Sequence, residues 1–240
     1  MSKRLKVSPL PPVPRWVWGG AAGVLAVVAM WMVAPKALRR LEFFRVRQIE
    51  LVGVRHLAPD AVIGALRLRS RASVFDDTQL LTDRVRGLRG VADARVERRL
   101  PGALKVIVRE VEPVALVAGP RGIVVVDAAA RPLPFDPARS GLDLPVAAQA
   151  DTGVIGVLAL VQAVDPALFE DITTARRAGA RGEVLLELDA RRVLLRADAG
   201  PEVIRAVVQV GRDLALKARP YGELDARFAG QVVVRRRARA

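Results

Sequence analysis

The sequence predicts an α+β protein: an N-terminal transmembrane helix, a small strand–helix–helix–strand–strand domain, and a second mixed α/β domain with a mostly antiparallel sheet. Three observations support this prediction. An uncharged run near the N-terminus is long enough to cross a bilayer. The next segment changes from strand to helix periodicity and back again. The second half alternates short apolar strands with apolar helices, and 240 residues can form two cores.

The chain is strongly basic, with 39 basic and 25 acidic residues and a formal net charge of +14. Such a charge makes nucleic acid and anionic membranes the first partners to consider. Aromatic residues make up 4% of the chain, which is too few for the stacking platforms that single-stranded nucleic acid needs. We therefore expect no nucleic-acid partner.

The residues that usually carry catalysis are scarce. Cysteine is absent and His56 is the single histidine, so disulfides, thiolate metal sites and multi-histidine metal sites are excluded. No serine lies in a nucleophile motif, and there is no phosphate-binding glycine loop. His56 has no evident catalytic partner, which favours a polar loop residue. The sequence predicts no catalytic residue, no cofactor and no metal.

Residues 16–34 are predicted to form a transmembrane helix. The uncharged run "WVWGGAAGVLAVVAMWMV" is about 27 Å long as a helix, close to the thickness of the hydrocarbon core. Trp16, Trp18 and Trp31 lie near its ends, where interfacial tryptophan is enriched.

A cleaved signal peptide is the alternative interpretation of this run. The preceding tail, residues 1–15, is long for a signal, and Pro35 disfavours cleavage, so we expect an uncleaved anchor. Basic residues both precede and follow the run, so charge alone does not set its orientation. Gly19 and Gly23 form a G-x-x-x-G pair, which is compatible with a weak homodimer through this helix.

The small domain is predicted over residues 43–113. Alternation over residues 46–51 indicates a strand that ends at Gly53. Pro59 is placed for the first turn of a helix. The apolar face of this helix comprises Val62, Ile63 and Leu66.

A second helix is predicted to start at Asp76. Asp76 and Gln79 have the spacing of a capping box, so we interpret the Asp76–Asp77 pair as a cap rather than a metal or acid–base site. A hairpin follows, with its turn at residues 100–102. The apolar stripe of the helix comprises Leu80, Leu81, Val85 and Leu88, and the inward residues of the hairpin comprise Ala94, Val96, Leu104, Val106 and Val108.

The second domain is predicted over residues 114–235, with a basic tail at 236–240. Residues 153–164 are apolar but too short to cross a bilayer, so we interpret them as a buried helix. Later patterns predict a hairpin with its turn near residues 189–191, then an amphipathic helix. Two closing strands are predicted near residues 224–228 and 231–235.

This order of features resembles the FtsQ/DivIB family of bacterial cell-division proteins. The domain that follows the membrane span in that family is a polypeptide-transport-associated (POTRA) domain of β-α-α-β-β order. Its marks are a strand ending in V-x-G, a V-x-x-A-x-V-x-R-x-x-P hairpin and an E-x-x-P-V-A exit. In this sequence the corresponding residues are Val52, Gly53 and Val54, Val91 through Pro101, and Glu110, Pro113, Val114 and Ala115.

Two later segments extend the resemblance into the second domain. "VVVDAAARPL" resembles a family element that has glycine where this chain has Ala130. "ELDARFAGQVVVR" resembles the closing hairpin of the family.

The resemblance implies a non-enzymatic scaffold of the division machinery. It places residues 1–15 in the cytoplasm, the span in the inner membrane, and both domains in the periplasm at the division septum. The implied partners are proteins resembling FtsB and FtsL, other divisome members at the POTRA domain, and inner-membrane lipid around the span. The alternative is a membrane-anchored basic protein that binds an anionic polymer, either nucleic acid or cell wall.

The resemblance also implies where the partner binds. An exposed sheet edge can accept a partner strand by β-augmentation, and the family uses its last strands in this way. Phe228 corresponds to an aromatic anchor beside that edge. The candidate binding residues are Phe228, Gln231, Val232, Val233, Val234 and Arg235, with Arg176 as a further candidate for pairing with an acidic partner side chain.

Overall fold

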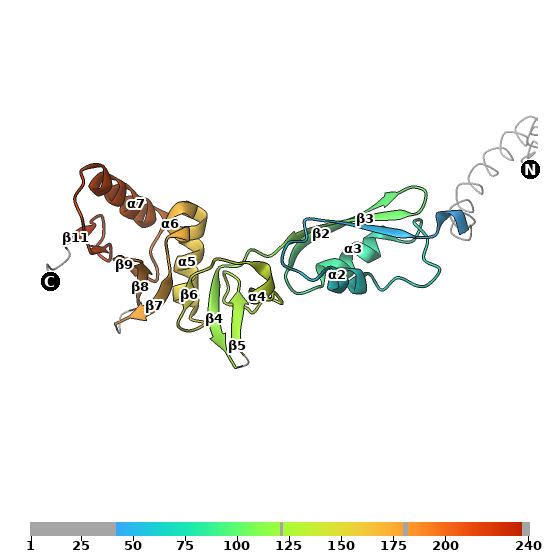
Figure 1. The fold of residues 1–240 in the computed structure, drawn as a ribbon, viewed down its shortest axis with the longest axis horizontal. Coiled ribbons are helices and arrows are strands. Elements are labelled where there is room, and N and C mark those ends of the chain that lie inside the picture. The colour runs from blue at the N-terminus through green and yellow to red at the C-terminus, as the bar shows by residue number, and fades with distance from the viewer. Residues whose placement is uncertain (1–41, 121, 180–181, 237–240) are drawn as a thin grey trace, which may run out of the picture.

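The computed structural model describes residues 42–120, 122–179 and 182–236 of the chain. The predicted tail and span and the last four residues lie outside these ranges. Within them, no helix combines the length and apolar character needed to cross a membrane. The described part is elongated, with two sheet-containing regions arranged end to end (Figure 1).

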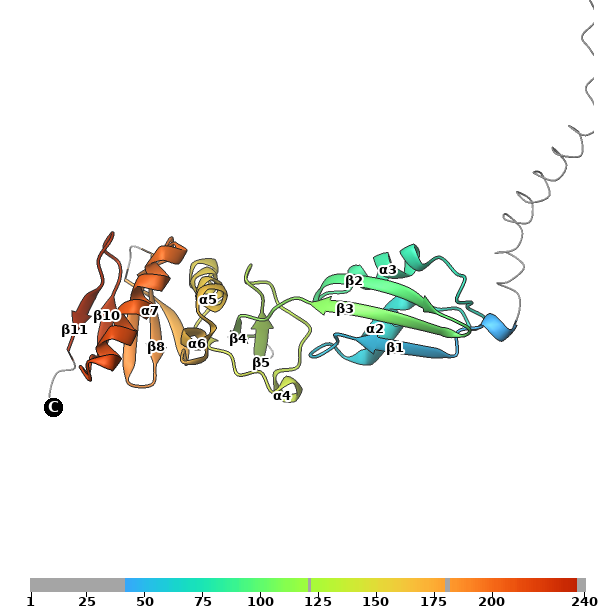
Figure 2. The same ribbon diagram turned by 90° about the horizontal axis from the view of Figure 1, so that it is seen from above.

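The first region has the predicted β-α-α-β-β order. Its two longer helices lie on one face of a three-stranded sheet of order β1-β3-β2 (Figure 2). β1 runs parallel to β3, and β2 runs antiparallel to it. The elements are η1 (Glu42–Phe44), β1 (Gln48–Val52), α2 (Pro59–Leu66), α3 (Thr78–Arg86), β2 (Val91–Arg99) and β3 (Ala103–Glu110).

The core of this region follows the predicted hairpin alternation, because successive strand residues point to opposite faces of a sheet. All five inward hairpin residues are buried: Ala94, Val96, Leu104, Val106 and Val108. They form one cluster with Val62, Leu66, Leu81 and Val85 of the helices. The expectation was wrong for Ile63 and Leu80, which are 39% and 49% exposed. Each follows or precedes a buried residue by one position, and a helix turns about 100° per residue.

The cap of α3 lies one residue later than predicted. Asp77, not Asp76, accepts hydrogen bonds from the backbone N–H groups of Gln79 and Leu80, at 2.9 and 3.3 Å. Asp76 instead accepts from the N–H of Ser73 at 3.1 Å and closes the preceding turn. A cap carboxylate reaches N–H groups two and three positions ahead, which from Asp77 are the free groups of the first helical turn.

Two motif residues connect the end of β1 to the end of β3. Gly53 has a φ of +83°, and a Cβ there would lie 2.1 Å from the carbonyl oxygen of Val108. Glu110 accepts hydrogen bonds from the three consecutive backbone N–H groups of residues 55–57, at 2.8 to 3.1 Å. The loop after β1 is therefore held by one carboxylate.

The second region is an eight-stranded sheet of order β11-β10-β9-β8-β7-β6-β4-β5, with α5, α6 and α7 on one face (Figures 1 and 2). Four of its seven strand pairs are antiparallel, in line with the predicted mostly antiparallel sheet, and β4–β6, β6–β7 and β9–β10 pair in parallel. Helical crossovers such as α5 and α7 make parallel neighbours possible. The elements are β4 (Ala115–Gly119), β5 (Gly122–Val126), α4 (Pro137–Ser140), β6 (Val146–Ala147), α5 (Thr152–Val164), α6 (Pro166–Glu170), β7 (Thr174–Ala178), β8 (Glu183–Leu188), β9 (Arg191–Arg196), α7 (Pro201–Leu216), β10 (Glu223–Asp225) and β11 (Val233–Arg235).

The two regions are joined by apolar packing. Val125, Leu133 and Phe135 belong to the same buried cluster as the core of the first region. The ring of His56, in the loop after β1, lies 5.5 Å from the ring of Phe135. The first core therefore includes residues from the segment that sequence assigns to the second domain.

Candidate partner-binding site

The closing strands are shorter than predicted. β10 ends at Asp225, and β11 starts at Val233 and forms one edge of the eight-stranded sheet. Phe228, Gln231 and Val232 therefore lie in the connecting loop, where the N–H of Gln231 donates to the carbonyl of Phe228 at 3.2 Å. These residues form a loop and not a strand because Gly230 has a left-handed conformation, with a φ of +70°, and turns the chain back toward β10.

The hydrogen bonds between β9 and β10 define the direction of the β10 backbone. The N–H of Arg192 donates to the Gly222 carbonyl, and the N–H of Ala226 donates to a β9 carbonyl, both at 2.9 Å. Neighbouring residues in a strand point their backbone groups to opposite sides. The backbone groups of Glu223 and Asp225 therefore face β11.

Val234 consequently points its backbone N–H and C=O away from the sheet. In the antiparallel register, Arg235 pairs with Glu223 and Val233 pairs with Asp225, so the backbone groups of Arg235 and Val233 face β10. Val234 lies between them and faces the opposite way. Among the described strands, β11 pairs with β10 alone, which leaves this edge open.

Apolar side chains accompany the open edge. Val233 and Val234 are each 39% exposed, and Phe228 in the adjoining loop is 53% exposed. The Phe228 ring lies 5.9 Å from the guanidinium carbon of Arg227. Exposed aromatic and branched side chains beside free backbone groups are what strand addition uses for specificity and affinity.

A charged network fixes β11 to β10 on the sheet face that points away from the helices. The side chain of Asp225 is fully buried and accepts hydrogen bonds from Arg227 at 2.7 and 2.8 Å and from Arg235 at 3.1 Å. Arg227 also pairs with Glu183 at 2.8 Å, and Arg235 with Glu223 at 3.3 Å. We call these five residues the Asp225 network.

The central pair of the network, Asp225 and Arg227, remains ionised at neutral pH. Hydrogen bonds from Arg227 hold the pKa of the Asp225 carboxyl below its usual value, against the opposing effect of burial. Asp225, and then Glu183, raise the pKa of the Arg227 guanidinium. Each charge therefore stabilises the charged form of its partner.

Arg176 lies away from the edge but on the same face of the sheet. The strand register aligns Val233, Asp225, Leu194, Leu185 and Arg176 in one row across five strands. At the usual strand spacing, the two ends of this row are about 19 Å apart. A partner strand on β11 would therefore reach Arg176 only by crossing the face.

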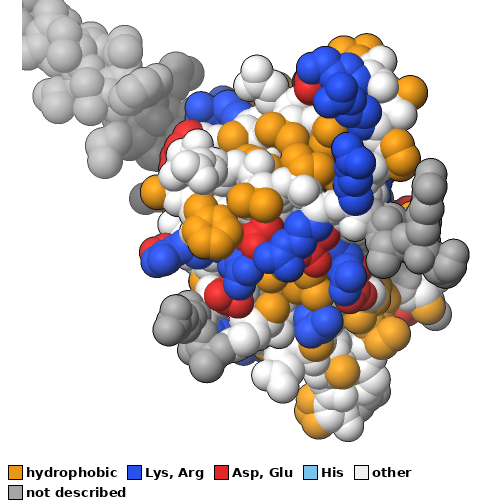
Figure 3. All heavy atoms as spheres, turned by 90° about the vertical axis from the view of Figure 1, so that its left-hand side faces the viewer, with side chains coloured by type: hydrophobic (Ala, Val, Ile, Leu, Met, Phe, Trp, Pro, Cys, Tyr) orange, Lys and Arg blue, Asp and Glu red, His pale blue; other side chains and the backbone are white. Residues whose placement is uncertain are grey.

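Arginines on this face are paired with acids. Arg176 lies 3.7 Å from Glu187, and Arg192 lies 3.9 Å from Glu223. Figure 3 looks onto the end of the molecule that carries α7 and β11, where basic side chains alternate with acidic and apolar ones. Both of these arginines therefore have an acidic partner within 4 Å.

Sequence reasoning missed the acids of the Asp225 network. The sequence did contain a sign of this network: Asp225 and Arg227 are two positions apart, and opposite charges occur at Glu183 on β8 and Arg235 on β11. A salt bridge between strands far apart in sequence depends on sheet order, which pattern alone does not supply.

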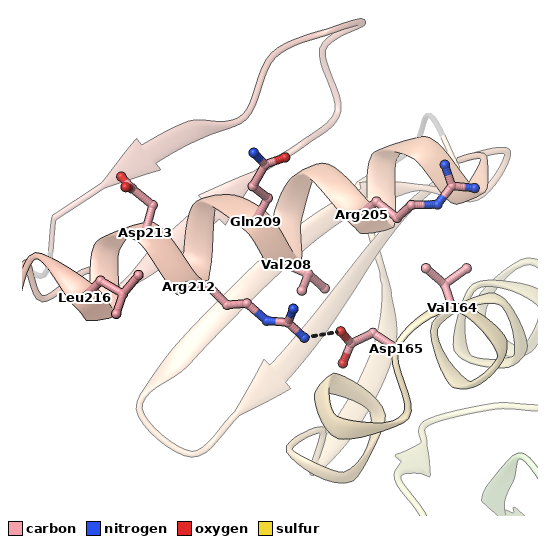
Figure 4. Close-up of a pocket in the computed structure, with 8 residues that line it drawn as sticks. All are labelled: Val164, Asp165, Arg205, Val208, Gln209, Arg212, Asp213 and Leu216. Atoms are coloured by element: carbon pink, nitrogen blue, oxygen red, sulfur yellow. Dashed lines mark hydrogen bonds and ion pairs between the residues drawn. The ribbon is translucent and has the colours of Figure 1, made fainter.

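A surface hollow beside α7 offers no catalytic arrangement. It has a volume of about 530 Å³ and lies between α7 and the corner joining α5 to α6 (Figure 4). Arg212 points across it to Asp165, with which it is paired at 2.8 Å. The other Asp165 oxygen caps α6 by accepting from the N–H of Leu168. Across the described ranges, no group of three acids or histidines could hold a metal ion.

The fold and the site together define a protein that has a POTRA domain followed by a sheet with an open C-terminal edge. Residues 44–110 match the family model described as "POTRA domain, FtsQ-type". The chain is 33% identical over 113 residues to "Cell division protein FtsQ" of Mycobacterium bovis and of two Mycobacterium tuberculosis strains. Residues 44–110 therefore form a POTRA domain of the FtsQ type, and the chain is similar to FtsQ cell-division proteins. The alignment covers 45% of this chain and 36% of each relative, so the chain spans about a third of their length.

Proposed function

We propose that the protein is a non-enzymatic scaffold of bacterial cell division. In this proposal residues 16–34 anchor it in the inner membrane, with residues 1–15 in the cytoplasm. The POTRA domain over residues 43–113 and the sheet domain over 114–235 lie in the periplasm, and the protein acts at the septum. The match to cell-division proteins supports the general role.

The proposed activity is capture of a partner strand by β11. The observation that carries it is the outward backbone of Val234 beside the exposed Phe228. A partner strand could pair with Val234 and extend the sheet by one member. The implied partners resemble FtsB and FtsL.

Anionic-polymer binding has less support at this site. Binding to a polyanion releases counterions from clustered, unpaired cations. The nearby Arg192, Arg227 and Arg235 each have an acidic partner within 4 Å. Their charges are therefore already engaged, whereas the backbone groups of Val234 are not paired within the described sheet.

Val234→Pro tests strand capture. Proline removes the outward N–H and is tolerated at sheet edges, so the domain should remain folded. We expect loss of co-purification with the FtsB- and FtsL-like partners. Val234→Thr is the control, because threonine keeps the N–H and the branched shape. Unchanged capture by a folded Val234→Pro protein would place the binding site elsewhere.

A fusion reporter tests the proposed topology. A reporter attached after Ala240 should be active in the periplasm and inactive in the cytoplasm. Activity confined to the cytoplasm would contradict the scaffold proposal even if strand capture occurred in vitro. Resistance of the complex to moderate salt would separate strand pairing from polyanion binding, which weakens steeply with salt.

A further inference from the structure

The POTRA domain carries exposed apolar side chains at the end nearest the N-terminus. Phe43 of η1 is 60% exposed, and Leu100 in the β2–β3 turn is 65% exposed. Figures 1 and 2 show η1 and this turn at the end opposite β11. The loop between α2 and α3 adjoins this end, because the N–H of Val46 donates to the Ala72 carbonyl at 2.9 Å. We call Phe43, Leu100, Arg99 and the two arginines of this loop, Arg69 and Arg71, the POTRA tip.

Backbone contacts hold together the two segments that carry Phe43 and Leu100. The N–H of Arg47 donates to the Gly102 carbonyl at 2.8 Å, so the chain after η1 is bonded to the turn that carries Leu100. A Cβ on Gly102 would lie 2.8 Å from the Arg45 carbonyl oxygen, which shows how closely these segments approach.

Aromatic packing explains why Phe43 stays outside. The adjacent Phe44 occupies the inner position, with its ring centroid 5.0 Å from that of Phe75. Phe43 contacts the outer side of Phe44, at 5.1 Å between ring centroids. The exposed Phe43 ring is therefore positioned by its contact with the Phe44 ring.

The arginines of the tip differ from their neighbours in having no partner. Among the described residues, the side chains of Arg69, Arg71 and Arg99 make no hydrogen bond or ion pair. In contrast, Arg98 donates to the carbonyls of Val74 and Asp76, and Arg45 pairs with Glu42 at 2.8 Å. The tip therefore combines exposed apolar groups with unpaired cations.

We propose that the POTRA tip docks on the anionic phospholipid headgroups of the membrane that holds the predicted span. Residues 35–41 separate the span from η1, and seven extended residues reach at most about 25 Å. Exposed Phe and Leu side chains can enter the boundary between headgroups and acyl chains, and guanidinium groups bind phosphate with two parallel hydrogen bonds. Docking rests on the span but not on strand capture by β11.

Depth-dependent quenching in the full chain tests this proposal. The chain has no cysteine, so Leu100→Cys allows one fluorescent label on the tip, and Leu216→Cys allows a matched label on α7. Leu216 is 88% exposed and lies on the element at the far end (Figure 1). The labelled proteins are reconstituted in vesicles that contain nitroxide-labelled lipid, with phosphatidylglycerol present or absent.

We expect the label at residue 100 to be quenched in phosphatidylglycerol vesicles and the label at residue 216 to be unaffected. Replacing Arg69, Arg71 and Arg99 with glutamate should lower the quenching at least about fivefold, the factor for losing one basic contact with an anionic surface. Thermal unfolding checks that this variant is folded.

Two outcomes with the cysteine labels would overturn docking. One is equal quenching of the two labels. The other is quenching at residue 100 that stays the same without phosphatidylglycerol and after replacement of the three arginines. The three tryptophans of the chain all lie in residues 16–34, so their quenching reports insertion of the span separately. Unquenched tryptophans would also overturn the proposal, because the tip would then have no bilayer beside it.

Discussion

Arg235 of the edge strand reaches the buried carboxylate of Asp225, with Nη2 and Oδ2 3.1 Å apart. The same carboxylate binds Arg227, which continues to Glu183 on β8. β11 has three residues and pairs with β10 over all three. The Asp225 network therefore adds side-chain contacts to a short strand ladder and helps to hold β11 at the edge of the sheet.

Arg235→Ala should weaken partner capture more than it weakens the fold. Arg235 is 56% exposed, so its pairs contribute about 0.5–1 kcal/mol to the free energy of unfolding. Asp225→Ala should cost about 2–3 kcal/mol, because Arg227 loses its buried partner. Urea unfolding of both variants measures these losses, and Arg235→Lys controls for charge. Equal losses for Arg235→Ala and Asp225→Ala would contradict a network centred on Asp225.

Acid should loosen the edge through Asp225. The folded-state pKa of this carboxyl lies below its usual value of 3.8, so its stabilisation is complete above that pH. The contribution is lost as pH falls from about 3.8 through the lower folded pKa. Asp127 and Asp151 have lowered pKa values as well, so the comparison is between wild type and Asp225→Asn. The free energy of unfolding should fall less steeply with acid in the variant; parallel curves would rule out this role.

Removing the Glu110 carboxylate should destabilise the POTRA domain. Glu110→Ala leaves three backbone N–H groups of residues 55–57 without their acceptor, at a cost of about 2–3 kcal/mol. Glu110→Gln keeps one acceptor oxygen and should cost less. Thermal unfolding orders the three proteins, and hydrogen exchange at residues 55–57 localises the change. Unaltered exchange in Glu110→Ala would show that this loop is held by other contacts.

Two glycines of the same domain should respond oppositely to alanine. Gly53→Ala should be strongly destabilising, because its Cβ would collide with the Val108 carbonyl and its φ is +83°. Gly64→Ala, in α2, meets no atom within 4 Å and should stabilise the protein by about 0.5–1 kcal/mol. Denaturant midpoints measure both. A tolerated Gly53→Ala would contradict the close approach of β1 and β3.

The sequence was most informative where local periodicity and burial coincide. The hairpin alternation correctly predicted the inward residues from Ala94 to Val108, because each strand has one face on a single core. Its errors were local. The cap of α3 moved from Asp76 to Asp77, since two adjacent aspartates have nearly the same pattern and hydrogen-bond geometry decides between them.

Ala130 shows how a motif can anticipate a conformation. Its φ is +58°, which explains why glycine is usual in the resembled element. The turn is maintained by Asp127, whose carboxylate accepts from the N–H groups of Ala129 and Arg131 at 2.9 Å. The side chains around the turn thus allow alanine in a backbone region that it rarely occupies.

By itself, the sequence determined the FtsQ-type POTRA domain, the order of its elements and most of its core, because these depend on motifs and on periodicity within short segments. Only the tertiary structure decided the order of the eight strands, and with it the position of β11 at an edge. It also decided that Val234 has the outward backbone and that Arg176 lies about 19 Å from Val233 along one row. These relationships join residues distant in the chain, and pairing between distant strands is set by the packing of the whole sheet.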